Sequence, residues 1–232
     1  MTGPEVRRPS LSRRAARLAA TPVRPWLEEP MRRVALRGRL TRPYWRLRFQ
    51  RFGEASILHR PDWVYGPGQI AIGDGVIILG HAWISVERVA WGLPAPVLRI
   101  GNGVGIRPYC TLSAAESIVI EDNVVISAFT TVIDLDHTWE GGSSENVAYG
   151  NPVRTAPVRI GRGTWVGERV SVLRGSTIGR FCVIGANSVV RGEIPDFSVA
   201  VGAPARVVGS TRERVGGPVG AAWVWRHKEG TR

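Results

Sequence analysis

Aliphatic residues recur every six positions through most of this chain, and this period constrains the fold more than any other feature. IGDGVI, IGNGVG, IGRGTW and IGANSV are four such units, each with an aliphatic residue first and a small residue fifth. An α-helix repeats every 3.6 residues and a β-strand every two, so neither keeps this spacing over fifteen units. The first positions are Ile72, Ile78, Ile84, Ile100, Ile106, Leu112, Ile120, Ile126, Val132, Ile160, Val166, Val172, Ile178, Ile184 and Val190.

A short strand followed by a tight turn every six residues predicts a parallel β-helix of triangular cross-section. Three units give coils of 18 residues, stacked at the inter-strand distance of about 4.8 Å. We expect the first-position side chains to form interior ladders and the small fifth-position side chains to fill the corners. Cys110 and Cys182 occupy fifth positions. We therefore interpret both cysteines as core residues, not as a disulfide or metal site.

The closing stretch of the repeat carries a family resemblance. PVRIGRGTWVGERVSVLRGSTIGRFCVIGANSVVRGEIPDFSVAVGAPARVV, at residues 157–208, resembles the C-terminal signature of the hexapeptide-repeat acyltransferases. The resemblance covers roughly residues 57–210 and is nearest to sugar and antibiotic O-acetyltransferases such as the maltose, galactoside and colanic-acid enzymes. It implies a left-handed coil, an exception to the right-handed crossover rule. It also implies a homotrimer with active sites between subunits and direct acyl transfer from acetyl-CoA.

The composition divides the chain into three parts: an arm at residues 1–56, the β-helix at 57–209 with a loop at 133–157, and a tail at 210–232. Residues 1–60 hold 15 arginines and four acids, whereas the rest of the chain is nearly balanced in charge. We expect two short helices in the arm, LSRRAARLAA and MRRVALRGRL, interrupted by its prolines. Such an arm suits contact with an anionic membrane surface, and nothing in it resembles a nucleic-acid-binding motif.

His137 stands where the six-residue period is lost, between Val132 and Ile160, in the segment DLDHTW. The resemblance implies that a histidine on this loop, just upstream of the restart PVRIGRGTWVG, is the general base. An imidazole in that role needs a partner that fixes its tautomer. Asp134 and Asp136 are the local candidates, and residues two apart in an extended segment share a face. Related enzymes often use a backbone carbonyl instead, so the partner stays open.

The remaining site residues follow from the resemblance alone. The residues expected to contact CoA are Trp165, Gly167, Ala186, Ser188, Arg191 and Arg206, with the two guanidiniums suited to phosphate. The residues expected near the acceptor are Arg107, Tyr109 and Trp139. Arg107 and Tyr109 stand where the galactoside and maltose enzymes have asparagines, so a simple galactoside is a poor candidate for the acceptor.

The function expected is acetyl transfer from acetyl-CoA to a sugar or glycan hydroxyl, without a metal. An antibiotic acceptor and a non-catalytic scaffold are the alternatives. A γ-type carbonic anhydrase needs three converging histidines, and only His81 and His137 lie in the repeat. The arm is also too short for the helical region of a serine acetyltransferase. No apolar run reaches the roughly 18 residues of a membrane span and no signal peptide is visible, so we expect a cytoplasmic protein, peripheral at most to the membrane.

Overall fold

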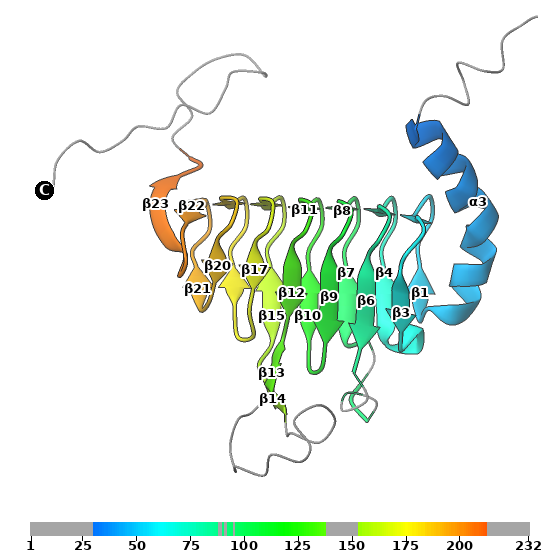
Figure 1. Ribbon diagram of the computed structural model, residues 1–232, viewed down its shortest axis with the longest axis horizontal. Helices are drawn as coiled ribbons and strands as arrows, with labels where there is room; N and C mark the ends of the chain where they lie inside the picture. The colour runs from blue at the N-terminus through cyan, green and yellow to red at the C-terminus, as the bar shows by residue number, and fades with distance from the viewer. Residues whose placement is uncertain (1–29, 88–89, 91, 95, 138–152, 213–232) are drawn as a thin grey trace, which may run out of the picture.

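Three parallel β-sheets enclose one core in the computed structural model, which describes residues 30–87, 90, 92–94, 96–137 and 153–212 (Figure 1). The seven-stranded sheet contains β1 (Arg51–Phe52), β4 (Ile70–Ile72), β7 (Leu98–Ile100), β10 (Ile118–Ile120), β15 (Val158–Ile160), β18 (Thr177–Ile178) and β21 (Glu193–Ile194). The eight-stranded sheet contains β2 (Ile57–Leu58), β5 (Ile77–Ile78), β8 (Gly105–Ile106), β11 (Val125–Ile126), β16 (Trp165–Val166), β19 (Val183–Ile184), β22 (Ser198–Val201) and β23 (Arg206–Ser210). The six-stranded sheet contains β3 (Trp63–Tyr65), β6 (Trp83–Val86), β9 (Thr111–Ala114), β12 (Thr131–Ile133), β17 (Ser171–Val172) and β20 (Val189–Val190).

The side chains of the repeat form the core in the way the sequence predicts. All fifteen first-position aliphatic side chains are at most 3% exposed. The small fifth-position side chains are buried as well, including Cys110 and Cys182, each 1% exposed. Successive coils place identical positions side by side, as in Ile118 with Val158 and Ile120 with Ile160. The parallel coiled architecture is therefore confirmed.

The coil length differs from the expected 18 residues over most of the chain. Ile160 pairs with Ile178, which gives the 18-residue spacing, but Ile100 pairs with Ile120, a spacing of 20. The extra residues always lie between a strand of the six-stranded sheet and the next strand of the seven-stranded sheet. The turns at the other two edges keep nearly the same length from coil to coil, so that neighbouring strands stay in register.

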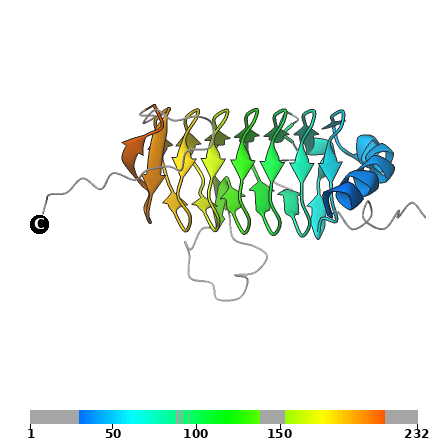
Figure 2. The same cartoon turned by 90° about the horizontal axis from the view of Figure 1, so that it is seen from above.

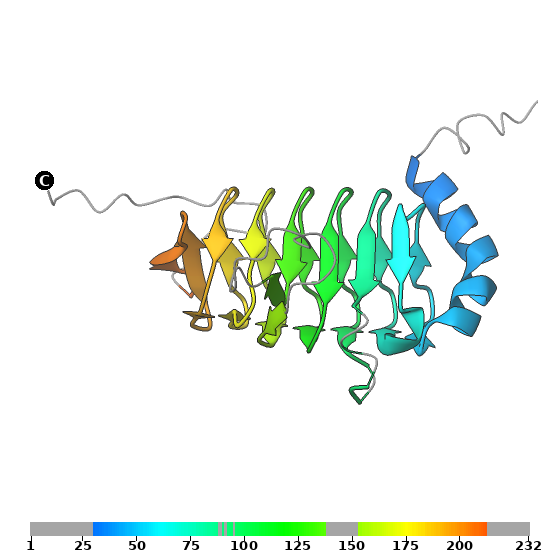
Figure 3. The same ribbon diagram turned by 60° about the horizontal axis from the view of Figure 1, so that its bottom comes forward.

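We call this edge the insertion edge. It comprises residues 66–69, 87–97, 115–117, 134–157, 173–176 and 191–192, with the gaps in the described ranges stated above. The short helix η1 (Pro67–Gln69) and both long insertions of the repeat leave the prism here. In Figures 1 and 3 the described residues between β6 and β7 and the β13–β14 arm leave from the same side of the molecule. One edge therefore carries every departure from the six-residue period.

The two ends of the prism are covered differently (Figure 2). At the C-terminal end, β23 pairs antiparallel with β22. At the N-terminal end, α3 (Pro30–Arg48) lies across the first coil, where a Cβ at Gly38 would be 2.7 Å from the Ile57 side chain. Each cover protects a terminal coil whose backbone groups would otherwise be unpaired.

The helix and the start of the β-helix depart from the expected boundaries. MRRVALRGRL is helical, but the helix continues through Pro43 to Arg48 instead of ending there. A proline inside a helix costs about 3 kcal/mol, and burial of Val34 and packing of Trp45 against the core offset that cost. The first strand begins at Arg51 and not at residue 57. The other expected helix, LSRRAARLAA, and the end of the tail lie outside the described residues.

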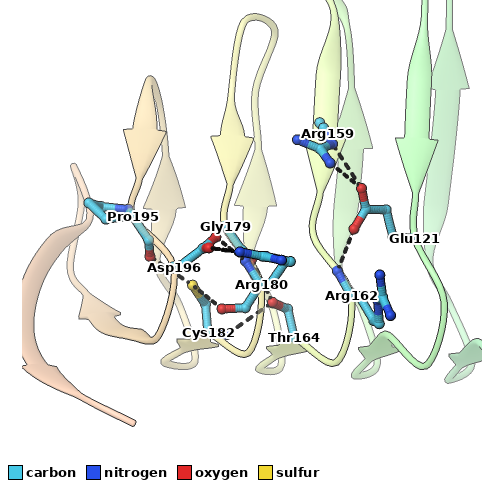
Figure 4. Close-up of polar contacts among 9 residues, drawn as sticks. All are labelled: Glu121, Arg159, Arg162, Thr164, Gly179, Arg180, Cys182, Pro195 and Asp196. Carbon is cyan, nitrogen blue, oxygen red and sulfur yellow. Dashed lines mark hydrogen bonds and ion pairs between the residues drawn. The ribbon is translucent and has the colours of Figure 1, made fainter. Parts of the chain in front are cut away.

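Carboxylates bind backbone amides between coils at the edge between the seven- and eight-stranded sheets (Figure 4). Asp196 Oδ1 accepts a hydrogen bond from Arg180 N at 2.8 Å, and Glu121 Oε2 accepts one from Arg162 N at 2.9 Å. The hydrogen bonds from Arg180 lower the pKa of Asp196. Burial alone would raise the pKa of Glu121, but the bonds from Arg162 and Arg159 outweigh it and lower that pKa. These acids serve the fold, and so they are poor candidates for catalysis.

A short antiparallel pair forms the base of the long insertion. In β13 (Leu135–His137) and β14 (Val153–Thr155), Leu135 pairs with Thr155 and His137 with Val153. Asp134, which precedes this pair, is fully buried. Its Oδ1 accepts from Ala115 N at 2.6 Å, and its Oδ2 accepts from the next two backbone amides, at 2.9 and 2.7 Å. The carboxylate thus ties the loop base to the preceding coil.

The buried thiols give the first testable prediction. Burial raises the pKa of Cys110 to about 11 and also raises the pKa of Cys182. The reactive species is the thiolate, so neither cysteine should react with 5,5′-dithiobis(2-nitrobenzoate) at pH 8 while the protein is folded. Both should react once it is unfolded in guanidinium. Rapid labelling of the folded protein would contradict the packing described above.

The Asp134 anchor gives the second prediction. Asp134→Asn places an amide NH2 against backbone N–H donors and should reduce the free energy of unfolding by about 2–4 kcal/mol. Asp122→Asn is the matched control, since Asp122 uses only its Oδ1, which asparagine keeps, to accept from Asn102 N. Urea unfolding measures both variants. Equal stability of the two variants would show that Asp134 does not anchor the loop.

Candidate active site

His137 is held at the rim of the long insertion, exposed to solvent, at the end of β13. Asp134 ties the base of this arm to the preceding coil, as described above. Asp136 ties it to the following coil through an ion pair with Arg174 Nε. The backbone that carries His137 is therefore fixed from both sides, which is what a positioned general base requires.

The two aspartates do not share a face as expected, because the chain bends at Asp134. Burial raises the pKa of the Asp134 carboxyl, and its three N–H donors oppose that rise. Its hydrogen bonds go to backbone amides of residues 115–117, and the ion pair of Asp136 goes to Arg174. Neither carboxylate is engaged with the imidazole among the described residues. Both carboxylates instead hold the base of the loop against the neighbouring coils.

A polar cluster on the same edge escaped the sequence-based interpretation. Ser85 Oγ and Ser113 Oγ lie 3.0 and 3.1 Å from Glu87 Oε1, and the two hydroxyls are 3.1 Å apart. Ser85 is 2% exposed although it lies on the outer face of β6. Ser113 also pairs in register with Ile133, on the strand that leads to His137. Glu87 stands where the period breaks off before the 88–97 insertion, the same signal that marks His137.

The residues expected at the cofactor lie mostly on another side of the prism. Trp165, on β16, is 45% exposed, and its Nε1 donates to Ser127 Oγ at 3.0 Å. Gly167 lies at the edge between the eight- and six-stranded sheets, where a Cβ would be 2.8 Å from Ala186 N. Ala186 is exposed on the next coil. Because Gly167 has no side chain and Ala186 has only a methyl group, nothing projects from the surface beside Trp165 at these two positions.

Ser188, Arg191 and Arg206 have separate environments. Ser188 is fully buried, and its Oγ accepts from Gly202 N at 3.1 Å, so its side chain belongs to the core and not to a binding surface. Arg191 is exposed on the insertion edge. Arg206 is exposed on β23, where its Nη1 donates to Ala205 O at 3.1 Å. One chain therefore does not bring these residues into one pocket with His137.

The residues expected at the acceptor include an aromatic stack. Tyr109 lies between His81 and Phe129, with ring centroids 4.7 and 4.9 Å away and the rings nearly parallel. We call this row, at the edge that also carries Gly167, the aromatic edge. Arg107 is exposed beside it. Trp139, the third expected residue, lies outside the described residues.

The histidines of the repeat are on different edges, His81 on the aromatic edge and His137 on the insertion edge. Across residues 30–137 and 153–212, apart from the short gaps near 88–95, no group of three His, Cys, Asp or Glu side chains is placed to hold a metal ion.

Comparison with known proteins gives matches for both the sequence and the fold. Residues 157–192 match the family described as bacterial transferase hexapeptide (six repeats). The chain is 36% identical over 177 residues to the probable acetyltransferase Rv3034c of Mycobacterium tuberculosis, covering 71% of this chain and 55% of that relative. It therefore spans little more than half of the relative's length.

A second relative is matched over more of its length. The putative lipopolysaccharide biosynthesis O-acetyl transferase WbbJ of Escherichia coli K12 is 29% identical over 174 residues, covering 73% of this chain and 82% of WbbJ. Among solved structures, a variant of AntD, an N-acyltransferase from Bacillus cereus in complex with dTDP and coenzyme A, superposes with a TM-score of 0.62. Its identity is 21%, and the match covers 75% of this chain and 90% of AntD, which shows a shared fold.

Both the sequence and the fold of the repeat region match known proteins. Its first and fifth positions build the core, and the matched segment 157–192 covers coils within the same prism. Residues 157–192 therefore match the bacterial transferase hexapeptide family, and the coils around them share the fold of AntD.

Proposed function

We propose that the protein is an acetyl-CoA-dependent O-acetyltransferase that acetylates a hydroxyl of a sugar or glycan, with His137 as general base. The observation that carries the proposal is the position of His137. It is exposed at the rim of an insertion that Asp134 and Asp136 tie to both neighbouring coils. The relatives named as acetyltransferases support the donor, and the bound coenzyme A in the AntD complex supports it through the shared fold.

The transfer is a direct attack on the thioester. A sugar hydroxyl is a poor nucleophile near neutral pH, and a positioned imidazole contributes about 10²- to 10⁴-fold as general base. The neutral ring nitrogen of His137 takes the hydroxyl proton as the oxygen attacks the carbonyl carbon of acetyl-CoA. The C–S bond then breaks, and the imidazolium returns the proton to the thiolate of CoA. The acetyl ester and free CoA are the products.

The site requires more than one subunit. His137 lies on the insertion edge, whereas Trp165 and Gly167 lie on or beside the aromatic edge of the same prism. We place the site between neighbouring copies in a homotrimer of left-handed coils, so that the insertion edge of one copy faces the aromatic edge of the next. Pantetheine would then lie along the low surface at Gly167 and Ala186. Arg191 and Arg206 would meet the phosphates, since guanidinium forks match phosphate oxygens.

The acceptor would lie between the polar cluster and the aromatic edge. Glu87 and Ser113, which are both half-buried, accept and donate hydrogen bonds as sugar hydroxyls require, and the buried Ser85 holds Glu87 in place. The half-exposed ring of Tyr109, from the neighbouring copy, offers an aromatic face to a sugar ring. The similarity to WbbJ, a putative O-acetyl transferase of lipopolysaccharide biosynthesis, favours a glycan. An antibiotic acceptor is the second candidate, and a catalytically inactive scaffold is the outcome if no acceptor supports turnover.

The third prediction concerns His137. In assays of thiol release from acetyl-CoA against a panel of sugars and antibiotics, His137→Ala should lower kcat by about 10²- to 10⁴-fold, because the acceptor proton then has no base. Acetyl-CoA binding, measured by calorimetry, should stay within about twofold of wild type. His59→Ala is the matched histidine control, because His59 follows β2 in the first coil, four coils before Trp165 on β16, and it should keep its turnover.

Two results would count against the proposal. Turnover that survives His137→Ala would remove the histidine from the mechanism. Absence of acetyl-CoA binding by the wild-type protein would remove the donor and favour the scaffold alternative.

A further inference from the structure

Helix α3 has an inner face that covers the first coil of the β-helix. Val34 and Gly38 are buried there, and Trp45 packs against the core cluster. Beyond the end of the helix, the Phe49 ring lies 5.6 Å from that of Trp45 and continues the same contact. This face accounts for the attachment of the helix, but not for its other apolar residues.

The opposite face of α3 carries a second apolar row. Leu36, Leu40, Tyr44 and Leu47 are 42, 73, 52 and 88% exposed. At about 100° per residue, the three leucines fall within about 40° of one another on the helix and point nearly opposite to Val34. We call these four residues the outer stripe. Exposed leucines in a single row, turned away from the protein core, mark a contact surface.

Arginines flank the outer stripe on both sides. Helix α3 contains seven arginines and no acidic residue. By the same helical spacing, Arg32, Arg39 and Arg46 lie along one flank and Arg33, Arg37 and Arg48 along the other. Several of them also contact neighbours on the protein: for example, Arg46 pairs with Glu54, and the Arg48 guanidinium lies 5.6 Å from the Tyr44 ring centroid. The outer stripe is thus an apolar row between two basic rows.

This arrangement matches the surface of an anionic membrane better than another copy of the chain. Leucines buried at the boundary of headgroups and acyl chains, with basic residues beside the phosphates, are the features of an interfacial helix. Two copies of α3 packed through the stripe would instead bring fourteen arginines together without an acid on either helix. In the described part of the chain, no helix is long and apolar enough to cross a bilayer, so α3 would lie along the surface.

We propose that α3 binds an anionic lipid surface through Leu36, Leu40, Tyr44 and Leu47. Figures 1 and 2 show α3 across the N-terminal end of the prism. The outer stripe is exposed and lies on the side of the helix opposite Val34, so it faces away from the coils. The membrane then lies across this end, and the insertion edge runs away from it. In the trimer proposed above, three parallel prisms place three such helices at the same end, which multiplies the attachment. The lipid contact itself is independent of the transfer chemistry.

Vesicle sedimentation of the full-length chain tests this proposal. Wild type should sediment with phosphatidylcholine vesicles that contain phosphatidylglycerol and remain in solution with phosphatidylcholine alone. The double variant Leu40→Glu, Leu47→Glu should lower the partition coefficient by about tenfold or more, because it removes the inserted side chains. The matched control is Val207→Glu, Val208→Glu, at exposed apolar positions of β23 on the other end. It changes the net charge equally and should lose about twofold or less.

Three outcomes overturn the proposal. If wild type does not sediment with the anionic vesicles at low salt, α3 binds no such surface. If both double variants lose binding equally, net charge and not the outer stripe determines it. If the α3 variant changes the oligomeric state in sedimentation equilibrium while the control does not, the stripe is a contact between copies of the chain.

Discussion

The hydrogen-bonded ladder between successive coils is the constraint on which the rest of this structure depends. Each strand pairs in parallel register with the strand one coil away, as Val125 pairs with Trp165 and Ile126 with Val166. Such pairing holds only if every coil follows the same three-sided path at about 4.8 Å spacing. An extra residue inside a face would move every later side chain out of the core. The chain therefore places its additions at one edge.

That constraint also determines where the residues of the proposed site lie. The insertions at 87–97 and 134–157 leave the same edge, so Glu87, Asp136 and His137 all lie along it. A rigid prism supplies the fixed frame, and buried carboxylates join the loop base to it. The residues proposed to contact the cofactor are placed differently: Gly167 and Ala186 are small where two coils approach closely. The catalytic site that we propose uses both kinds of surface and would therefore lie between neighbouring copies.

Much of the fold could be predicted because each hexapeptide encodes its own environment. An aliphatic first position and a small fifth position identify the buried side chains individually, and both cysteines follow the rule. Coil length was harder to predict, because a longer turn at one corner leaves the period inside each face unchanged. The helix through Pro43 was missed because local propensity predicts a break, whereas tertiary packing on both sides of the proline sustains the helix.

The contacts within the candidate site were harder to predict from the sequence than the fold, because they depend on how the chain bends and how the coils align. Asp134 and Asp136 are two residues apart, yet one carboxylate is buried on backbone amides and the other reaches Arg174, because the chain bends between the prism and the arm. The Ser85–Ser113–Glu87 cluster joins residues 26 to 28 positions apart through the coil register. Neither arrangement is visible in local spacing. The position of His137 was accessible because a lost period marks it directly.

The central claim is that His137 of one copy acts on a thioester held by its neighbour. A crystal structure of the protein with coenzyme A bound tests it most directly. The account predicts a trimer with the CoA sulfur beside the His137 imidazole of one subunit and the pantetheine along Gly167 and Ala186 of the next. CoA bound within a single subunit, or with its sulfur directed away from His137, would contradict it.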